Sequence, residues 1–394
     1  MKYWRGYLIA AIIAAVTWGI NKLGATYSNL VDMVYPYLTR TIQSFLAQWS
    51  GGLDFCVWQV GVVMLVLIAM ASIVLMIVFR WNPFQWLGWI LTGVATIWLL
   101  NTCIYGLNEH AGALSNDIRL NVTEYTLEEL EAATLYYRDL ANTLSDEVPR
   151  KENGDLDYPI FEELALYAGE GFKDLTYNHS YSVFAGSTLP VKKLGWSDMY
   201  TSSGTTGVTV GLTGEAAVNP ETPAVGLPFA MCHEMAHRMC ISIDRDANFA
   251  AFLACSNNSR AEFQYAAYYM AYRYCYNTLY AHGSAESTTA AARLHAGITE
   301  NLKRDLDAYS KFFTDDPNIK ASMLKEGDAE IAATPDESSA ASNQITDLLV
   351  SWHIQEVVLP AQAENAESTF DPYDESQVDL SGIVGALNKE KNDD

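Results

Sequence analysis

Residues 227–237 read Leu-Pro-Phe-Ala-Met-Cys-His-Glu-Met-Ala-His. Pro228 suits the first turn of a helix, and the residues after it favour one continuous helix through the run. Residues four apart share a helix face, so His233 and His237 would present two imidazoles to one metal ion. Glu234 is turned about 100° from His233, beside the ion, where it could take a proton from a zinc-bound water. The run therefore predicts a helix that carries a Zn²⁺ site, with Glu234 as its general base.

Zinc needs a third protein ligand, and three acids downstream are candidates. Asp244 falls on the same helix face as His237, but a straight helix would carry it ~10 Å further along the axis. A break over residues 240–243 would bring Asp244 or Asp246 back to the histidines. Glu262, on the next predicted helix, also stands at a workable spacing. Alternatively, Asp244 or Asp246 caps the second helix and Glu262 is a first-turn charge.

The first 110 residues contain long stretches without charge. Residues 57–79 form one such run, long enough to cross a hydrocarbon core of ~30 Å. A second uncharged run follows Arg80 and predicts a span at 83–107. A third candidate, at about 6–22, also fits a secretory signal peptide, but no small-x-small cleavage site follows it, which favours an uncleaved helix. We expect a membrane region over residues 1–110 with three transmembrane helices.

Basic residues around these spans predict the orientation of the chain. Lys2, Arg5 and Arg80 would lie on one side of the bilayer, against Lys22 and Arg40 in the loop between the first two spans. Because cytoplasmic loops carry an excess of Lys and Arg, the N-terminus is predicted in the cytoplasm. This gives a multi-pass protein of the cell membrane, in contact with the lipid bilayer, whose C-terminal domain is extracytoplasmic.

Residues 111–360 are expected to form that domain. Thr126-Leu-Glu-Glu129 is a capping box that opens an amphipathic helix, and helical patterns dominate the rest. In residues 184–220, apolar side chains alternate with Ser, Thr and Gly, which predicts a small antiparallel sheet. The predicted fold class is N-terminal transmembrane helices followed by an α+β, mainly helical domain. Residues 361–394 are acidic, with few large apolar side chains, and predict a loosely ordered tail.

Charge and cysteine content narrow the possible partners. The net charge of -23 argues against nucleic acid, because phosphate neutralisation requires clustered Lys and Arg. The six cysteines contain no CxxC pair. Their simplest interpretation is that they are small buried hydrophobes, although a disulfide is an alternative if the domain faces an oxidising compartment.

Several runs together resemble an uncharacterised family of bacterial multi-pass membrane proteins, a domain of unknown function with a predicted zincin-like metallopeptidase domain of HExxH type. The similar runs are residues 227–237, Asp244-Arg-Asp-Ala-Asn-Phe249, Gly211-Leu-Thr-Gly-Glu-Ala-Ala-Val-Asn219, Val34-Tyr-Pro-Tyr37 and Tyr125-Thr-Leu-Glu-Glu129. The resemblance covers most of the chain up to about residue 280 and implies a zincin-like fold. It is more specific than the five-residue metal motif alone.

Two departures from the family pattern concern the metal site. The family usually has Glu-x-Glu-Ala-Asn where this chain has Asp244-Arg-Asp-Ala-Asn248, and a Gly soon after the second His where this chain has Cys240. In related membrane zincins, a Glu-x-x-Ala-Asp motif supplies a zinc ligand from its first acid and an orienting group from its last residue. By that analogy Asp244 is the third ligand, and Asn248 orients one of the ligands without binding the metal itself.

The resemblance and the motif imply a membrane-anchored zinc-dependent hydrolase, a metallopeptidase acting on a peptide or protein substrate. An extended substrate could pair with the strand at 214–219, which makes Gly214, Glu215 and Asn219 candidate substrate contacts. Alternatively, this strand only completes the sheet. An oxyanion donor is also needed, and the tyrosines of residues 260–280 are candidates, with core packing as their alternative.

A non-catalytic membrane sensor or binding module, with a structural or lost metal site, is the competing hypothesis. A structural zinc site normally has four protein ligands, and Cys240 is the one nearby candidate for a fourth.

Overall fold

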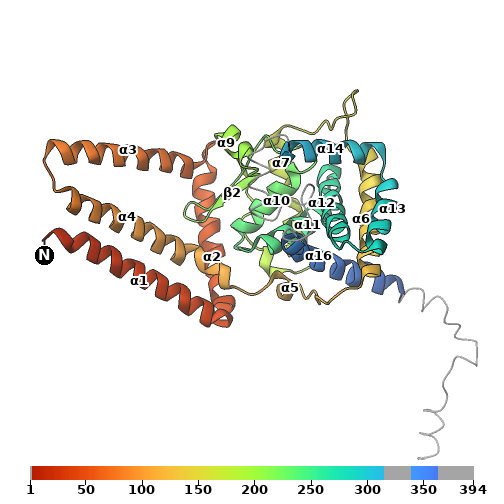
Figure 1. The fold of residues 1–394 in the computed structure, drawn as a ribbon, viewed down its shortest axis with the longest axis horizontal. Helices are drawn as coiled ribbons and strands as arrows, with labels where there is room; N and C mark the ends of the chain where they lie inside the picture. Colours follow the sequence, from red (N-terminus) through yellow and green to blue (C-terminus); the bar gives the residue numbers. More distant parts are fainter. Residues whose placement is uncertain (1, 315–338, 363–394) are drawn as a thin grey trace, which may run out of the picture.

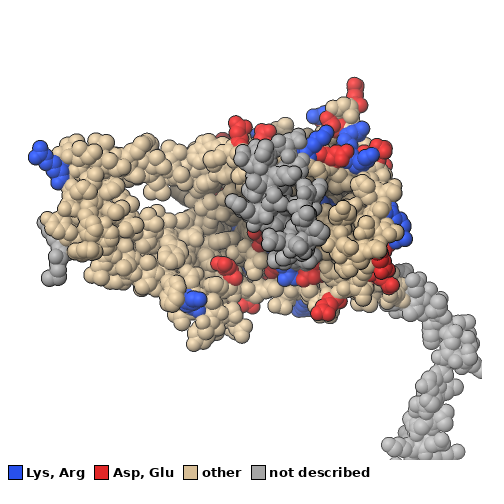
Figure 2. All heavy atoms as spheres, viewed as in Figure 1, with Lys and Arg blue, Asp and Glu red and all other residues tan. Residues whose placement is uncertain are grey.

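The computed structural model describes residues 2–314 and 339–362. Three helices extend from one side of the molecule, namely α1 (Arg5–Thr26), α3 (Val57–Val78) and α4 (Pro83–Ile104) (Figure 1). Each has 22 residues and is apolar enough to cross a membrane. Many of their large apolar side chains are exposed, and Figure 2 shows few charged side chains in this part of the molecule. The three predicted spans are confirmed as apolar helices of membrane length.

α1 and α4 pack closely because glycines face the contact. A Cβ atom on Gly6 would lie 2.5 Å from the backbone of Gly88. Thr92 donates a hydrogen bond from Oγ1 to the Gly6 carbonyl oxygen at 2.9 Å. Small residues allow such an approach between apolar helices, where backbone packing and hydrogen bonds replace the hydrophobic effect.

The segment between the first two apolar helices was expected to be a loop. It instead forms an α-helix, α2 (Ser28–Gly51). Figure 1 shows α2 lying across the ends of α1, α3 and α4, between them and the rest of the chain. Arg40 donates from Nε to the Met239 carbonyl at 3.2 Å, and Gln43 donates from Nε2 to the Gly211 carbonyl at 2.8 Å. α2 therefore joins the apolar helices to the domain through polar contacts.

The rest of the described chain forms a mainly helical domain, as expected. The capping box is present: the Thr126 hydroxyl accepts the N–H of Glu129, whose carboxylate accepts the N–H of Thr126. The helices are α5 (Leu114–Asp117), α6 (Leu127–Glu147), α7 (Phe161–Tyr167), α8 (Glu170–Tyr177), α9 (Ser197–Ser202), α10 (Leu227–Arg238), α11 (Asp244–Ser256), α12 (Ala261–Ala281), α13 (Ala285–Ala296), α14 (Glu300–Thr314) and α16 (Ser339–His353). The shorter turns are η1 (Lys2–Trp4), η2 (Gly106–His110), η3 (Ser182–Phe184) and η4 (Ile354–Val358).

The small sheet contains β1 (Lys192–Lys193), β2 (Gly207–Val210) and β3 (Glu215–Val218), in the order β1-β3-β2. β2 pairs with β3 in antiparallel orientation, whereas β1 pairs with β3 in parallel. The prediction of an antiparallel sheet is therefore wrong for one of the two pairings. A tight turn at residues 211–214 forces β2 and β3 to be antiparallel. The longer connection through α9 leaves β1 free to join the other edge of β3 in either direction.

The core of the domain is centred on α12, which contacts α6, α10, α11, α13 and α16. Tyr265, Tyr269 and Tyr272 on this helix are almost fully buried, and Tyr268, Tyr274 and Tyr276 pack against the same core. The core interpretation of these tyrosines therefore holds.

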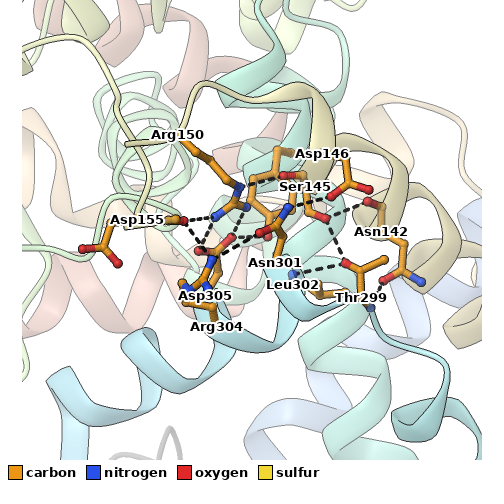
Figure 3. Close-up of polar contacts among 12 residues, drawn as sticks. Asn142, Ser145, Asp146, Arg150, Asp155, Thr299, Asn301, Leu302, Arg304 and Asp305 are labelled. Carbon is orange, nitrogen blue, oxygen red and sulfur yellow. Dashed lines mark hydrogen bonds and ion pairs between the residues drawn. The ribbon is translucent and has the colours of Figure 1, made fainter. Parts of the chain in front are cut away.

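A buried ion pair fastens α14 to the segment that follows α6. Arg150 Nη2 lies 2.7 Å from Asp305 Oδ2, and the two side chains are 11% and 5% exposed. The Tyr265 hydroxyl donates to the same carboxylate oxygen at 2.6 Å. Figure 3 shows this pair beside further polar contacts between the two segments, including the bond from Asn301 to Asp146.

All six cysteines are free, and all except Cys103 are buried, which agrees with their interpretation as small buried hydrophobes. The predicted tail at 361–394 lies outside the described residues, apart from its first two.

Candidate metal centre

The histidine motif lies on α10, with Pro228 in the first turn of the helix. His233 and His237 are one turn apart, and their Nε2 atoms are 3.0 Å from each other. Two nitrogens bound to one tetrahedral zinc at ~2.0–2.1 Å would lie ~3.3 Å apart. The helix therefore brings the two imidazoles together, as the four-residue spacing predicts.

A turn after α10 returns the chain to the histidines. Cys240 has a φ of 70°, in the left-handed region that glycine adopts freely and other residues adopt rarely. This explains physically why a glycine would suit the position. Beyond the turn Asp244 begins α11, and its Oδ1 lies 3.2 Å from His237 Nε2 and 4.0 Å from His233 Nε2. The expected break over residues 240–243 is present, and Asp244 reaches the histidines.

The other two candidate acids lie elsewhere. Asp246 is buried, and its Oδ2 accepts the N–H of Leu114 at 2.8 Å. Glu262 is buried beside Arg260, whose guanidinium donates to both of its carboxylate oxygens. In the described part of the chain, the donors close enough to share one ion are those of His233, His237 and Asp244.

Neighbouring groups that are not metal donors orient the two imidazoles. His237 Nδ1 lies 2.8 Å from the Ile241 carbonyl oxygen. Because a carbonyl only accepts, Nδ1 carries a proton, so Nε2 is the nitrogen of the neutral ring that can offer its lone pair to a metal. Asn248 lies beside His233, the position that the resemblance implies, and acts to raise the pKa of its ring. His233 Nδ1 nevertheless lacks a partner of good geometry among the described atoms.

Burial and neighbouring charges set the protonation of the three donors. Burial and the adjacent His237 lower the pKa of His233 to about 3, so this imidazole is neutral near pH 7. Burial also acts to lower the pKa of His237, but the bond to Asp244 and the charge of Glu234 outweigh it and raise that pKa. The same bond lowers the pKa of Asp244. The Asp244 side chain is 84% exposed, so the site opens to solvent on this side.

Glu234 lies next to the three donors and is held by β2. The Thr209 hydroxyl donates to Glu234 Oε2 at 2.6 Å. A Cβ atom on Gly207 would lie 2.5 Å from Glu234 Oε1, so glycine leaves room for the carboxylate. Burial raises the pKa of Glu234, against the opposing effects of His237 and Thr209. Thr209 lies in no recognisable sequence motif, and Gly207 resembled an ordinary turn glycine.

Tyr105 is a further neighbour of the site that the sequence did not identify. It directly follows α4, and its hydroxyl donates to the His237 carbonyl oxygen at 3.0 Å. The hydroxyl also lies beside Ser242 and close to the carboxylates of Glu234 and Asp244. A tyrosine that follows an apolar run carries no recognisable motif, because its role depends on a contact with a distant helix.

The three predicted substrate contacts lie on or beside β3, which is the central strand. Both edges of β3 are occupied, so the expectation that this strand pairs with an extended peptide is wrong. Gly214 forms the tight turn with a φ of 65°, and a Cβ atom there would lie 2.7 Å from the Ala47 backbone. Glu215 is buried against Lys192, and Asn219 is buried with its amide donating to Thr201. β3 was expected to have a free edge because its neighbour β1 is only two residues long and leaves almost no pattern in the sequence.

The fold and the site define a chain with three apolar helices of membrane length and a helical domain that carries a His, His and Asp donor group. A model of the family described as "Protein of unknown function (DUF3810)" matches residues 31–324, which include α2 and the whole donor group. The chain belongs to this family. No curated protein and no solved structure matches the chain.

Proposed function

We propose that this chain is a membrane-anchored zinc-dependent hydrolase with a zincin-like site, and that it acts on peptides or proteins. The observation that carries the proposal is the convergence of His233, His237 and Asp244, with Glu234 beside them. Two imidazoles and one carboxylate form a ligand set found in catalytic zinc sites, where three protein ligands leave one position open. When bound, zinc would lower the pKa of a water molecule to ~7 and polarise a carbonyl group.

The residues around the donor group have separate roles in this proposal. Glu234 takes the proton of the attacking water and delivers it to the leaving amine, and Thr209 keeps its carboxylate in place. Tyr105 supplies a phenol that can stabilise the oxyanion after exchanging its bond to the His237 carbonyl. β2, an edge strand of the described sheet, takes over from β3 as the strand that pairs with an extended substrate.

In the same proposal α1, α3 and α4 cross the membrane and place the domain on its outer face. The start of α1 and the turn between α3 and α4 lie at the ends of these helices that are remote from the domain (Figure 1), and these two segments contain Arg5 and Arg80. Arg40, a charge that argued against this orientation, is buried on α2 and bonded to the Met239 carbonyl. Arg40 is therefore not a solvent-exposed charge of a loop. Without it, the excess of basic residues on the cytoplasmic side is larger.

The competing function is a non-catalytic sensor or binding module with a structural or lost metal site. Its structural-zinc form would require a closed metal site with a fourth protein ligand. Cys240 was the candidate, but its thiol lies beside Thr39 and Asn108, toward α2. In the described ranges no fourth His, Cys, Asp or Glu joins the donor group. The open position favours the hydrolase over a module with a structural zinc.

Glu234→Gln tests this proposal. The amide keeps the size of the side chain, and Glu234 is not a ligand, so zinc content and fold should remain unchanged. Hydrolysis of a peptide library by the zinc-loaded chain should fall by ~10²-fold or more, the usual contribution of a general base. Glu221→Gln, at an exposed acid outside the donor group, should preserve both. Full turnover by Glu234→Gln would refute the mechanism, and zinc binding by the wild type without turnover would favour the binding module.

A further inference from the structure

α2 buries a largely polar face and exposes an apolar one. Thr39, Arg40, Gln43 and Ser50 recur at helical spacing and are buried against the rest of the chain. On the opposite face, large apolar side chains are 57–69% exposed: Leu30, Met33, Val34, Leu38, Phe45 and Trp49. An amphipathic helix on the surface of a water-soluble domain has the reverse arrangement.

Neither charged residue of α2 lies on its apolar face, although Asp32 is itself exposed. Asp32 accepts the N–H of Gly112 on Oδ1 at 2.8 Å. Arg40 donates to the carbonyl oxygens of Met239 and Ser182 at 3.2 and 3.1 Å. The apolar face therefore carries no charged side chain, which favours contact with an apolar medium over contact with water.

The surroundings of α2 indicate that this medium is lipid. Figure 1 shows α2 lying across the ends of α1, α3 and α4, so helices that cross a membrane would hold it at the membrane surface. Its exposed side chains, like those of these three helices, are mostly large and apolar. Interfacial helices lie in the membrane plane with the apolar face ~5–10 Å into the boundary between headgroups and acyl chains.

The metal centre is attached to the same elements. Gln43 of α2 donates to the Gly211 carbonyl, in the turn that joins β2 to β3. Arg40 holds the carbonyl of Met239, two residues after His237. Tyr105, the residue directly after α4, donates to the His237 carbonyl itself. The ligand helix α10 therefore touches both α2 and the end of a membrane-length helix.

We propose that α2 lies in the membrane interface with its apolar face in lipid, and that this holds the metal centre at the membrane surface. Its substrates are then the juxtamembrane segments of polypeptides anchored in the same membrane. The part about substrates rests on the proposed peptidase function, whereas the position of α2 does not. A site so close to the bilayer reaches peptide bonds near the membrane and is badly placed for bonds far from it.

Spin labels on cysteine variants of the full chain in lipid nanodiscs test the position of α2. Val34→Cys and Phe45→Cys place labels on its apolar face, in a background where the exposed Cys103 is replaced by serine. Ile160→Cys and Tyr177→Cys are matched controls, since these side chains are also exposed, at 70% and 80%, but lie on the domain. Oxygen, which concentrates in lipid, should relax the α2 labels more than a water-soluble nickel chelate does, and the control labels should show the reverse.

A pair of tethered peptide libraries tests the substrate class. Both carry the same randomised segment on a lipid anchor in vesicles that contain the chain. One has a 5-residue spacer, which reaches at most ~17 Å, and the other a 40-residue Gly/Ser spacer with an r.m.s. length of ~35 Å. The short-spacer library should be cleaved faster, on the order of tenfold, because its effective concentration near the membrane is higher.

The outcomes separate the two proposals. Relaxation of the α2 labels by nickel, as in the controls, would overturn the interfacial position. Spin–spin coupling between two copies through Val34→Cys would also overturn it, because the occupant would then be a second chain. Equal or faster cleavage of the long-spacer library would overturn the substrate class and leave the hydrolase intact. Failure to cleave either library, or a soluble one, would refute the proposed function, and the spin labels would still decide where α2 lies.

Discussion

Glu215 connects the membrane-length helices to the sheet, and its replacement gives a strong test of that junction. Its side chain is 0% exposed. It accepts the N–H groups of Val57 and Trp58, in the first turn of α3, at 2.8 and 3.0 Å. Its Oε1 also lies 2.8 Å from Lys192 Nζ, which donates further to the carbonyls of Ser50 and Phe55.

Glu215→Gln removes the charge and keeps the size of the side chain. Removing one partner of a buried ion pair costs about 3–5 kcal/mol, because the other charge stays buried. The loss of an anion at a helix N-terminus costs about 0.3–1 kcal/mol and overlaps with that figure. We therefore expect a loss of about 4 kcal/mol, which for a domain of this size corresponds to a melting temperature lower by on the order of 10 °C.

Thermal unfolding of the purified chain in detergent, followed by circular dichroism, measures this effect. Glu221→Gln is the matched control, since Glu221 is exposed, and it should melt within about 1–2 °C of the wild type. A melting temperature of Glu215→Gln equal to that of the control would refute the structural role. Unchanged melting with weakened cleavage would restore Glu215 as a substrate contact.

Three further predictions concern ionisable side chains that are buried or belong to the donor group. Asp305→Asn should lower stability by about 3–5 kcal/mol, measured by chemical denaturation, because it leaves the Arg150 guanidinium buried without its carboxylate. Burial lowers the pKa of His353 from its ordinary value, so the unfolded chain binds more protons below about pH 6.5 and stability falls as the pH drops from 7 to 5. His353→Phe should flatten this pH dependence, and an unchanged slope would contradict the assignment. Asp244→Asn should weaken zinc affinity in a chelator competition titration, whereas Asp246→Asn should not, and the opposite pattern would make Asp246 the ligand.

Local periodicity was enough to predict the parts of the site that lie on one helix. The spacing of His233 and His237 places both imidazoles on one face of α10, and the proline of the run, Pro228, lies in the first turn, where a helix tolerates it. The choice among the acids could not be made in this way. It depends on a turn in which Cys240 adopts a φ of 70°, and a cysteine does not predict this left-handed conformation.

Other features were missed because they depend on segments far apart in the chain. Glu215 resembles a polar residue on a strand until Lys192 and the start of α3 are placed around it. α2 was interpreted as a loop because its buried face is polar and its exposed face is apolar, so it offers no long uncharged run. The orientation of β1 depends on a connection whose path is not encoded in the two residues of that strand.

The zinc content of the purified full chain tests the central claim most directly. After dialysis against metal-free buffer, elemental analysis should find one zinc per wild-type chain. His237→Ala should retain little or none, because it removes one of the three donors that the structure brings together. His179→Ala, at an exposed histidine outside the donor group, should retain the wild-type content. Equal zinc in His237→Ala and the wild type, or none in either, would contradict the metal centre.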